Sequence, residues 1–452
     1  MDRSGSTLPG GTLRRSRVLY ATLAVVIAVV GLATVGTVSA GAQSSKPKAD
    51  DVGITATEIH VAVIADVDNS LAPGVFKASV DAMNAWAKVV NKDGGLAGRK
   101  VVVDLIDSKL NPNTTRNATI TACANDFAMV GGEALFMSNV DDMVACQNGA
   151  GQPIGLPDMP GLALDPTQSC SPVSYPIIGY GPYCTTKDQN PQTYLASQGD
   201  ARYYVSQNKG LHGVWLVPAD LKSTKNSLLP SYNAMVNLGI KKDGDGFYDT
   251  FQPDPQSALT PVIQEIKKDN STFAYSGSDK MASLRKEATL QGVTSVKVWG
   301  CTQACYSKKF LEAGGADVEG TQSVITTLPF YTEYKLNPTL KKLVAAVGGI
   351  DKVDSNAVAS WLAALLFQDA VGKASANGGT LSRQTLFDAL KQETKFDAAG
   401  IMGATNVAEH LQPTCIVMTQ VKNGKLVRSF PTKAGTFDCS PKNVVEIKLD
   451  LS

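Results

Sequence analysis

Histidine is scarce in this chain of 452 residues, with only His60, His212 and His410, and these lie far apart. The sequence has no Gly-x-Ser-x-Gly elbow, no Walker-type phosphate loop and no His-Glu-x-x-His metal helix. Acid–base chemistry would therefore have to depend on carboxylates. These absences favour a protein that is not an enzyme, and we expect neither a bound metal nor a cofactor.

A strong net charge is absent as well. The 42 Lys and Arg residues are balanced by 41 Asp and Glu residues, so the formal net charge is +1 at pH 7. Without a global positive field, nucleic-acid binding is not expected. Charged residues make up 18% and hydrophobic residues 43% of the chain, which is typical of a folded globular protein. The length allows about two or three domains.

The N-terminal segment differs from the rest of the chain. A cluster of three arginines precedes an apolar run over residues 18–38, and small residues follow at 39–42. This pattern predicts an export signal over residues 1–42 and a polar linker over residues 43–54. The apolar run is also long enough for an uncleaved membrane anchor. In both cases we expect the body of the protein to be exported and extracytoplasmic, either secreted or tethered in the cell envelope.

Eight cysteines follow this segment. In an exported chain an even number of cysteines favours disulfides over metal ligands. Pairing on locality alone gives Cys123–Cys146, Cys170–Cys184, Cys301–Cys305 and Cys415–Cys439. The third pair does not have Cys-x-x-Cys spacing, which argues against a thioredoxin-like redox site.

A helical pattern is joined to a strand pattern by a glycine turn. Apolar residues recur at helical spacing between Phe76 and Val90, and a short apolar run at 101–106 suits a buried strand. The turn between them reads Asn-x-x-Gly-Gly-Leu-x-Gly-Arg over residues 91–99. With a strand pattern at 58–66, these segments form a βαβ unit.

Strand and helix patterns alternate along the rest of the chain. This alternation predicts mostly parallel sheets that are covered by helices on both faces. The predicted strands lie near Ile59, Val101, Met129 and Ile154, at 213–217, near Phe247, at 272–275 and at 296–299. The predicted helices lie at 192–207, at 228–238, at 357–366 and after Ser382, which is expected to be an N-cap.

Two segments do not fit this alternation. Residues 160–191 are rich in Pro, Gly and Ser, which predicts a loop that crosses to a second lobe. Near the C-terminus, an Asn-Gly pair at 423–424 separates two apolar runs. Such a pair predicts a β-hairpin.

The glycine turn at 91–99 and the segment Gly53–Ile59 resemble the type I periplasmic solute-binding proteins, in particular the branched-chain amino-acid (Leu/Ile/Val) binding group. A weaker likeness continues almost to the C-terminus. The resemblance implies an α/β fold of two Rossmann-like lobes that are crossed three times by the chain and close around a ligand. Lobe 1 would comprise residues 55–172 and 329–394, and lobe 2 residues 173–328 and 395–452.

The same resemblance implies a function. The protein would capture a small organic molecule in the cleft between the lobes and deliver it to the membrane permease of an ABC importer, acting as a monomer. A membrane-anchored ectodomain that senses a ligand is the alternative. Whether the mature N-terminus keeps the apolar run of residues 18–38 distinguishes the two.

Family members hold their ligand with loops that follow strands, so the resemblance also implies candidate binding residues. Those of lobe 1 are Glu133, Phe136, Ser138, Asn139, Asp158 and Met159. Those of the second half are Ser223, Thr224, Ser276, Thr302, Gln303 and Tyr331. Ser138 and Asn139 precede a predicted helix, where they could bind an anion or act only as a cap.

The loop at 300–305 departs from the family pattern. Amino-acid-binding relatives commonly have a carboxylate in this region that receives the ammonium group of the ligand, whereas this chain has Thr302 and Gln303. A buried ammonium without a counter-charge would cost several kcal/mol. An ordinary α-amino acid is therefore not the expected ligand, unless Glu133 or Asp158 supplies the charge.

Overall fold

The computed structural model describes residues 51–69, 73–137, 139–178, 192–218, 222–250 and 256–451. These residues belong to one compact unit. The predicted signal or anchor segment at 1–42 and most of the linker lie outside the described residues. Within the described part of the chain, no helix is both long enough and apolar enough to cross a membrane.

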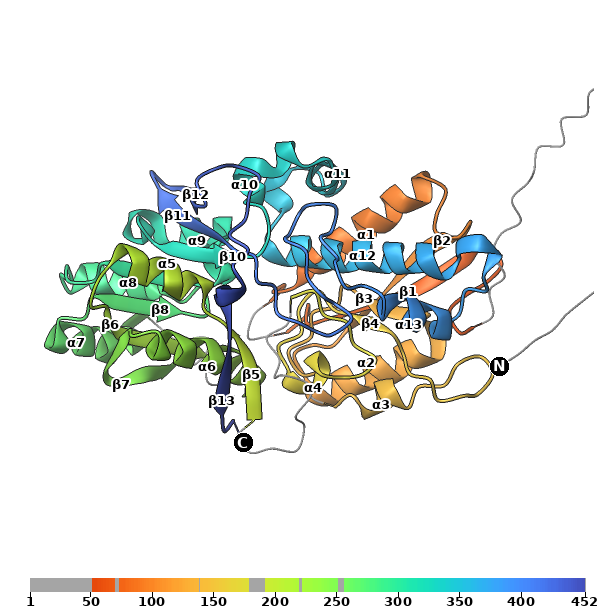
Figure 1. The fold of residues 1–452 in the computed structure, drawn as a ribbon, viewed down its shortest axis with the longest axis horizontal. Helices are drawn as coiled ribbons and strands as arrows, with labels where there is room; N and C mark the ends of the chain where they lie inside the picture. Colours follow the sequence, from red (N-terminus) through yellow and green to blue (C-terminus); the bar gives the residue numbers. More distant parts are fainter. Residues whose placement is uncertain are drawn as a thin grey trace, which may run out of the picture. The chain divides into compact units, whose positions relative to one another are not determined.

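The first sheet has four parallel strands in the order β2-β1-β3-β4 (Figure 1). These strands are β1 (Glu58–Ala65), β2 (Lys100–Asp107), β3 (Ala128–Val130) and β4 (Asp158–Met159). Helices α1 (Lys77–Lys92) and α12 (Ser355–Ala374) lie on one side of the sheet, and α2 (Pro112–Asn125) lies on the other. Because both faces are covered, β1 is almost completely buried, as its apolar sequence predicts.

The strand predicted near Ile154 begins four residues later, at Asp158. Pro153 forms only an isolated bridge with Gln147. Gly155 has a φ of 94°, which turns the chain there and delays the extended segment that joins β3. The prediction of a strand in this region was therefore right in kind and wrong in position.

The second sheet has seven strands in the order β12-β11-β10-β9-β8-β6-β7. Their bounds are β6 (His212–Pro218), β7 (Lys241–Thr250), β8 (Phe273–Ser276), β9 (Val298–Cys301), β10 (Gln322–Ile325), β11 (Val417–Lys422) and β12 (Lys425–Phe430). Strands β6 to β10 are parallel, whereas β11 is antiparallel to both of its neighbours. The predicted hairpin is confirmed, because Asn423 and Gly424 both have positive φ between β11 and β12.

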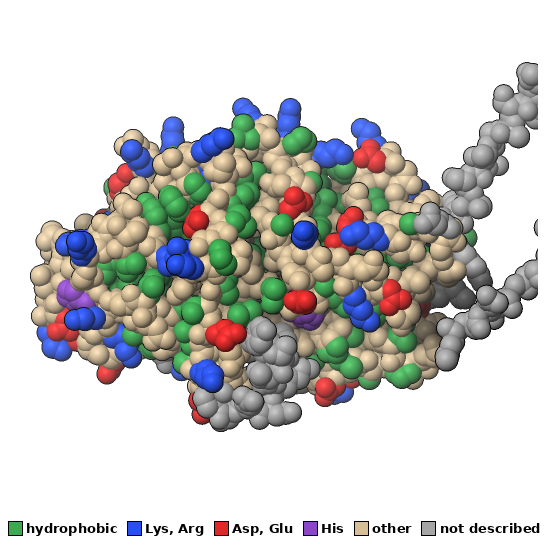
Figure 2. Space-filling model, in the orientation of Figure 1, with side chains coloured by type: hydrophobic (Ala, Val, Ile, Leu, Met, Phe, Trp, Pro, Cys, Tyr) green, Lys and Arg blue, Asp and Glu red, His purple; other side chains and the backbone are tan. Residues whose placement is uncertain are grey.

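Among the described residues, five helices accompany the second sheet. They are α5 (Gly199–Gln207), α6 (Lys222–Asn237), α7 (Thr260–Asp269), α8 (Met281–Leu290) and α9 (Lys308–Gly314). Figure 2 shows that positive and negative side chains are interspersed over one face of the molecule, as expected for a chain with a net charge of +1.

The helix predicted over residues 192–207 is wrong in its first part. Residues Gln192–Ser197 form strand β5, which is antiparallel to β13 (Val444–Leu449), and helix α5 begins only at Gly199. Side chains of β5 such as Thr193 and Tyr194 suit a strand. The partner strand comes from the far end of the chain, so local periodicity could not reveal this pairing.

The order of the elements takes the chain between the two sheets three times. It leaves the first sheet after β4, leaves the second sheet after β10, and returns from α13 (Arg383–Leu390) to β11. Helix α12 packs against α1, beside the first sheet. Ser382 caps α13, with Thr385 completing a capping box.

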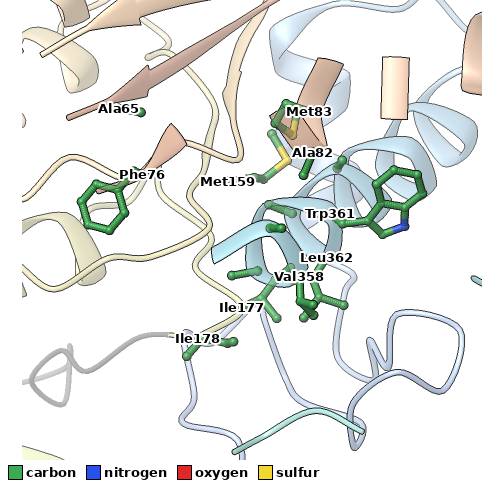
Figure 3. Packing of buried hydrophobic residues seen from close by; sticks show 14 of the residues in the cluster. Ala65, Phe76, Ala82, Met83, Met159, Ile177, Ile178, Val358, Trp361 and Leu362 are labelled. Carbon is green, nitrogen blue, oxygen red and sulfur yellow. The ribbon is translucent and has the colours of Figure 1, made fainter. Parts of the chain in front are cut away.

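The core of the first lobe lies between its sheet and α12. Figure 3 shows Met83 and Met159 close together beside the residues of α12, among them Trp361. Trp361 is 2% exposed and Met159 is fully buried. The core thus fixes the start of α12 relative to the ends of β1, β3 and β4.

Three of the four predicted disulfides are present, namely Cys123–Cys146, Cys301–Cys305 and Cys415–Cys439. The fourth prediction includes Cys184, which lies outside the described residues. The Cys301–Cys305 bridge encloses Thr302 and Gln303 in the turn that follows β9, so it restrains two candidate binding residues.

Candidate ligand-binding site

A cavity of about 300 Å³ lies where loops that follow strands of both sheets meet. The first lobe contributes Val75, Phe76, Leu162, Leu164, Asp354, Ser355 and Asn356. The second lobe contributes Thr224, Ser227, Leu228, Gly277, Ser278, Asp279, Thr302, Gln303, Ala304, Ser307 and Lys309. Ligands of open α/β sheets bind outside the carboxyl ends of the strands, and this cavity has that position in both sheets.

In the second-lobe wall of the cavity, hydrogen bonds hold together the loops that follow β8 and β9. The Thr302 hydroxyl donates to the Gly277 carbonyl oxygen at 2.9 Å, which ties the loop after β9 to the loop after β8. The Ser276 hydroxyl donates to the Ser278 carbonyl oxygen at 2.9 Å. Ser276 therefore lies behind the cavity wall and shapes it, while Thr302 and Gln303 line it.

Three charged side chains line the same cavity, namely Asp279, Lys309 and Asp354. Asp354 is the N-cap of α12 and accepts a hydrogen bond from the Ala357 backbone N–H at 2.9 Å. Burial raises the pKa of Asp354, while that hydrogen bond and the Lys309 ammonium oppose the shift. The cavity can therefore pair with a cationic group through its acids or with an anionic group through Lys309.

The sequence predicted none of these charged residues as binding candidates. The resemblance pointed to an acid at 300–305, whereas Asp279 follows the end of β8 and Asp354 directly precedes α12. The available signals were the position of Asp279 just beyond the Ser276–Ser278 segment and the preference of Asp for helix N-caps. Asp279 and Asp354 place acids at the cavity that the loop at 300–305 lacks.

Glu133 is buried in the first lobe and is 1% exposed. Within the described part of the chain, neither of its carboxylate oxygens receives a hydrogen bond. Burial raises the pKa of Glu133 well above its usual value, and the Asp354 carboxylate adds to this shift. The nearby Ser79 hydroxyl opposes the shift without forming a hydrogen bond of normal geometry. This shift disfavours the charged carboxylate, so Glu133 is a poor counter-charge for an ammonium group.

Asp158 and Met159 have their contacts inside the first lobe. The Asp158 carboxylate accepts hydrogen bonds from Gln168 Nε2 at 3.0 Å and from Ser174 Oγ at 2.7 Å. Burial raises its pKa to about 6, against the effect of these two donors. Met159 packs in the core of the lobe. These contacts give both residues a structural role.

The other candidates are spread over the protein. Phe136 and Ser223 line a separate cavity of about 580 Å³, where Ser223 Oγ donates to the Leu135 carbonyl oxygen at 2.9 Å. Asn139 is exposed and accepts from the Asp141 N–H at 3.1 Å, which is a turn contact. Ser138 lies outside the described residues.

Tyr331 is held by its own neighbours. Its hydroxyl donates to the Val353 carbonyl oxygen at 2.9 Å, and its ring packs against Tyr306 and Phe330. Of the twelve candidate ligand-binding residues, the 300 Å³ cavity thus brings together Thr224, Thr302 and Gln303, with Ser276 behind them.

The protein thus has two α/β lobes and a cavity at the carboxyl ends of their strands. This arrangement is typical of two-lobed binding proteins. The sequence profile of the periplasmic binding protein family matches residues 58–425, and the chain belongs to this family. The type I fold implied by the glycine turn at 91–99 is thereby confirmed. A search of curated protein sequences finds no match.

Several solved structures share the fold. A leucine-binding protein of Thermotoga maritima is 16% identical, with a TM-score of 0.61, and the match covers 82% of this chain and 97% of that chain. A fatty acid ABC transporter substrate-binding protein of Thermomonospora curvata is 18% identical, with a TM-score of 0.65 and coverage of 86% and 98%. A solute-binding protein of R. palustris in complex with 4-hydroxybenzoate is 14% identical, with a TM-score of 0.61 and coverage of 82% and 95%. At these identities the likeness shows the fold alone.

Proposed function

We propose that this protein is an extracytoplasmic solute-binding protein that captures a small organic molecule in the 300 Å³ cavity and delivers it to the permease of an ABC importer. The observation that carries the proposal is the cavity itself, because loops at the strand ends of both sheets line it. A ligand that contacts both walls would favour the closed arrangement of the lobes. Family membership and structural relatives that are named as ABC transporter proteins support this role.

We infer the chemical class of the ligand from the cavity lining. One part of the wall is apolar and includes Phe76, Leu162 and Leu228, whereas Asp279, Asp354 and Lys309 supply charge. A small amphipathic molecule with one charged end fits this division. The structural relatives are named for leucine, fatty acid and 4-hydroxybenzoate, and each of these has an apolar part and an acidic group.

Lobe boundaries are part of the proposal. Lobe 1 comprises residues 55–172 and 329–394, and lobe 2 comprises residues 173–328 and 395–452. We propose that the protein catalyses no reaction and binds its ligand as a monomer.

A tethered sensing ectodomain is the alternative because of the apolar run at residues 18–38. N-terminal sequencing of the exported protein distinguishes the two, since cleavage removes that run.

The test of solute capture is a thermal-shift screen of the chain from Gln43 onward. The panel contains amino acids, amides, aromatic acids and short-chain acids. A ligand at a hundredfold excess over its Kd adds about 2.7 kcal/mol to the free energy of unfolding. We expect at least one hit, and solute capture loses its support if the whole panel leaves the melting curve unchanged.

A pair of matched variants locates the hit. Asp279→Asn removes a carboxylate from the cavity wall, and Asp388→Asn removes an exposed carboxylate from α13. We expect the first variant to change the shift caused by a charged hit and the second to preserve it. Equal responses of both variants would place the ligand elsewhere.

A further inference from the structure

A cluster of three potential metal ligands lies away from the cavity, at the edge of the first sheet. His60 on β1, Asp104 on β2 and Asp126 directly after α2 each bring one ligand atom within 4.8 Å of the others. His60 Nδ1 is 2.8 Å from Asp104 Oδ2. These residues are distant in sequence and are brought together by the parallel pairing of β1 with β2.

Asp126 is the residue that sets this cluster apart from an ordinary surface ion pair. It is 1% exposed, and within the described part of the chain its Oδ1 atom receives no hydrogen bond. A buried carboxylate oxygen without a donor costs free energy unless a cation or a proton satisfies it. A bound cation would therefore stabilise the buried Asp126 carboxylate.

Asp126 is also held in place from behind. The buried Arg383 guanidinium donates to the Asp126 and Cys123 backbone carbonyl oxygens, and its Nη1 lies 3.0 Å from Cys146 Sγ. The Cys123–Cys146 disulfide joins α2 to the segment after α3 (Asp141–Val144). These contacts use the backbone of Asp126 and leave its side chain directed to the cluster, although the Arg383 charge offsets part of the negative potential there.

The remaining geometry also suits a metal. Glu58 Oε2 is 3.6 Å from His60 Nε2, which is longer than a hydrogen bond but adds negative charge beside the ring. His60 Nδ1 faces Asp104, so a metal bound to Nδ1 would replace the proton shared by these two groups. The side chains of His60 and Asp104 are 30% and 43% exposed, which gives an ion access from solvent and room for water ligands. Ligand atoms around tetrahedral zinc are about 3.3 Å apart, so small side-chain rotations would close the site.

We propose that His60, Asp104 and Asp126 bind a divalent first-row cation such as Zn²⁺. One imidazole nitrogen and two carboxylate oxygens suit Zn²⁺, whereas Mg²⁺ and Ca²⁺ prefer oxygen ligands alone. The ion joins β1, β2 and the end of α2, so it stabilises the first lobe independently of solute binding. The sequence contains no metal signal here, because the spacing of these ligands matches no local motif.

Isothermal titration of the chain from Gln43 onward with ZnCl₂, after removal of bound metal by a chelator, tests the site. We expect one Zn²⁺ per chain with the wild type. His60→Ala and Asp104→Asn should weaken binding by more than the about 10- to 100-fold that loss of an outer partner typically costs. Glu58→Gln should weaken it by less than that range, because Glu58 lies near the ring without a hydrogen bond to it. Asp104 is half-exposed, so its variant should keep the wild-type fold in circular dichroism.

His212 provides the matched control. Its Nδ1 is 2.8 Å from Asp243 Oδ2, which gives a second His–Asp pair in the other lobe, outside the three-residue cluster. His212→Ala should leave the affinity for Zn²⁺ unchanged. The proposal is overturned if the wild type binds no Zn²⁺, or if His212→Ala weakens binding as much as His60→Ala does.

Discussion

Buried acids in the first lobe illustrate how single residues determine pH dependence. Asp158 is 2% exposed, and burial raises its pKa from 3.8 to about 6 although two donors contact it. Because the folded-state pKa is the higher one, the protonated acid favours the folded state. The stability from this group is fully present below pH 3.8 and is lost as the pH rises through about 6.

Asp158→Asn should therefore remove a pH-dependent term from the free energy of unfolding. The amide does not ionise, so the difference in the free energy of unfolding between wild type and variant should fall by about 2 kcal/mol between pH 4 and pH 7. Urea unfolding at several pH values measures this difference. Asp388→Asn is the control for loss of an exposed carboxylate, and a difference for Asp158→Asn that does not change with pH contradicts the account.

For single residues, the sequence predicted only part of the cavity lining. Thr224, Thr302 and Gln303 were predicted because they follow strands, and they line the cavity. Asp354 was missed because its cap position depends on where α12 begins. The cluster around His60 was missed because sheet register, and no short motif, brings its members together.

Helix α10 (Phe330–Glu333) and strand β12 are joined by a buried ion pair. The Arg428 guanidinium donates from Nε and Nη2 to the two oxygens of Glu333, at 2.5 and 2.7 Å. The side chains are only 7% and 6% exposed. The Gly435 N–H also donates to Glu333 at 2.9 Å, so this carboxylate links the segment after β10 with the hairpin strand and the loop beyond it.

Glu333→Ala should destabilise the protein by about 3–5 kcal/mol, because it leaves the Arg428 charge buried without its partner. The exposed pair Lys77–Asp81 is the control, and Asp81→Ala should cost no more than about 1 kcal/mol. Urea unfolding of both variants checks the prediction. Similar costs for the two variants would mean that the buried pair does not hold α10 to β12.

For helices and turns, the sequence predicted the structure correctly where neighbouring residues determine it. Ser382 was predicted as an N-cap and forms a capping box with Thr385. The Asn-Gly pair predicted the hairpin, since both residues accept the positive φ of the turn. Strand β5 was predicted as helix because its pairing with β13 depends on a segment near the C-terminus.

For the molecule as a whole, alternation of strand and helix predicted the fold class, and the family resemblance predicted the three crossings of the chain. Neither could locate the cavity, because its wall combines segments that are far apart in the sequence. Phe76 lies early in the chain, Gln303 lies in the second lobe, and Asp354 lies on the return to the first. Only the folded arrangement shows that these residues line one space.

A crystal structure of the protein with the ligand found in the thermal-shift screen tests solute capture most directly. We expect ligand density in the 300 Å³ cavity, between Thr302 and Gln303 on one side and Leu162 and Asp354 on the other. Density in the 580 Å³ cavity beside Phe136 and Ser223, with the cavity at Thr302 free of ligand, would contradict it.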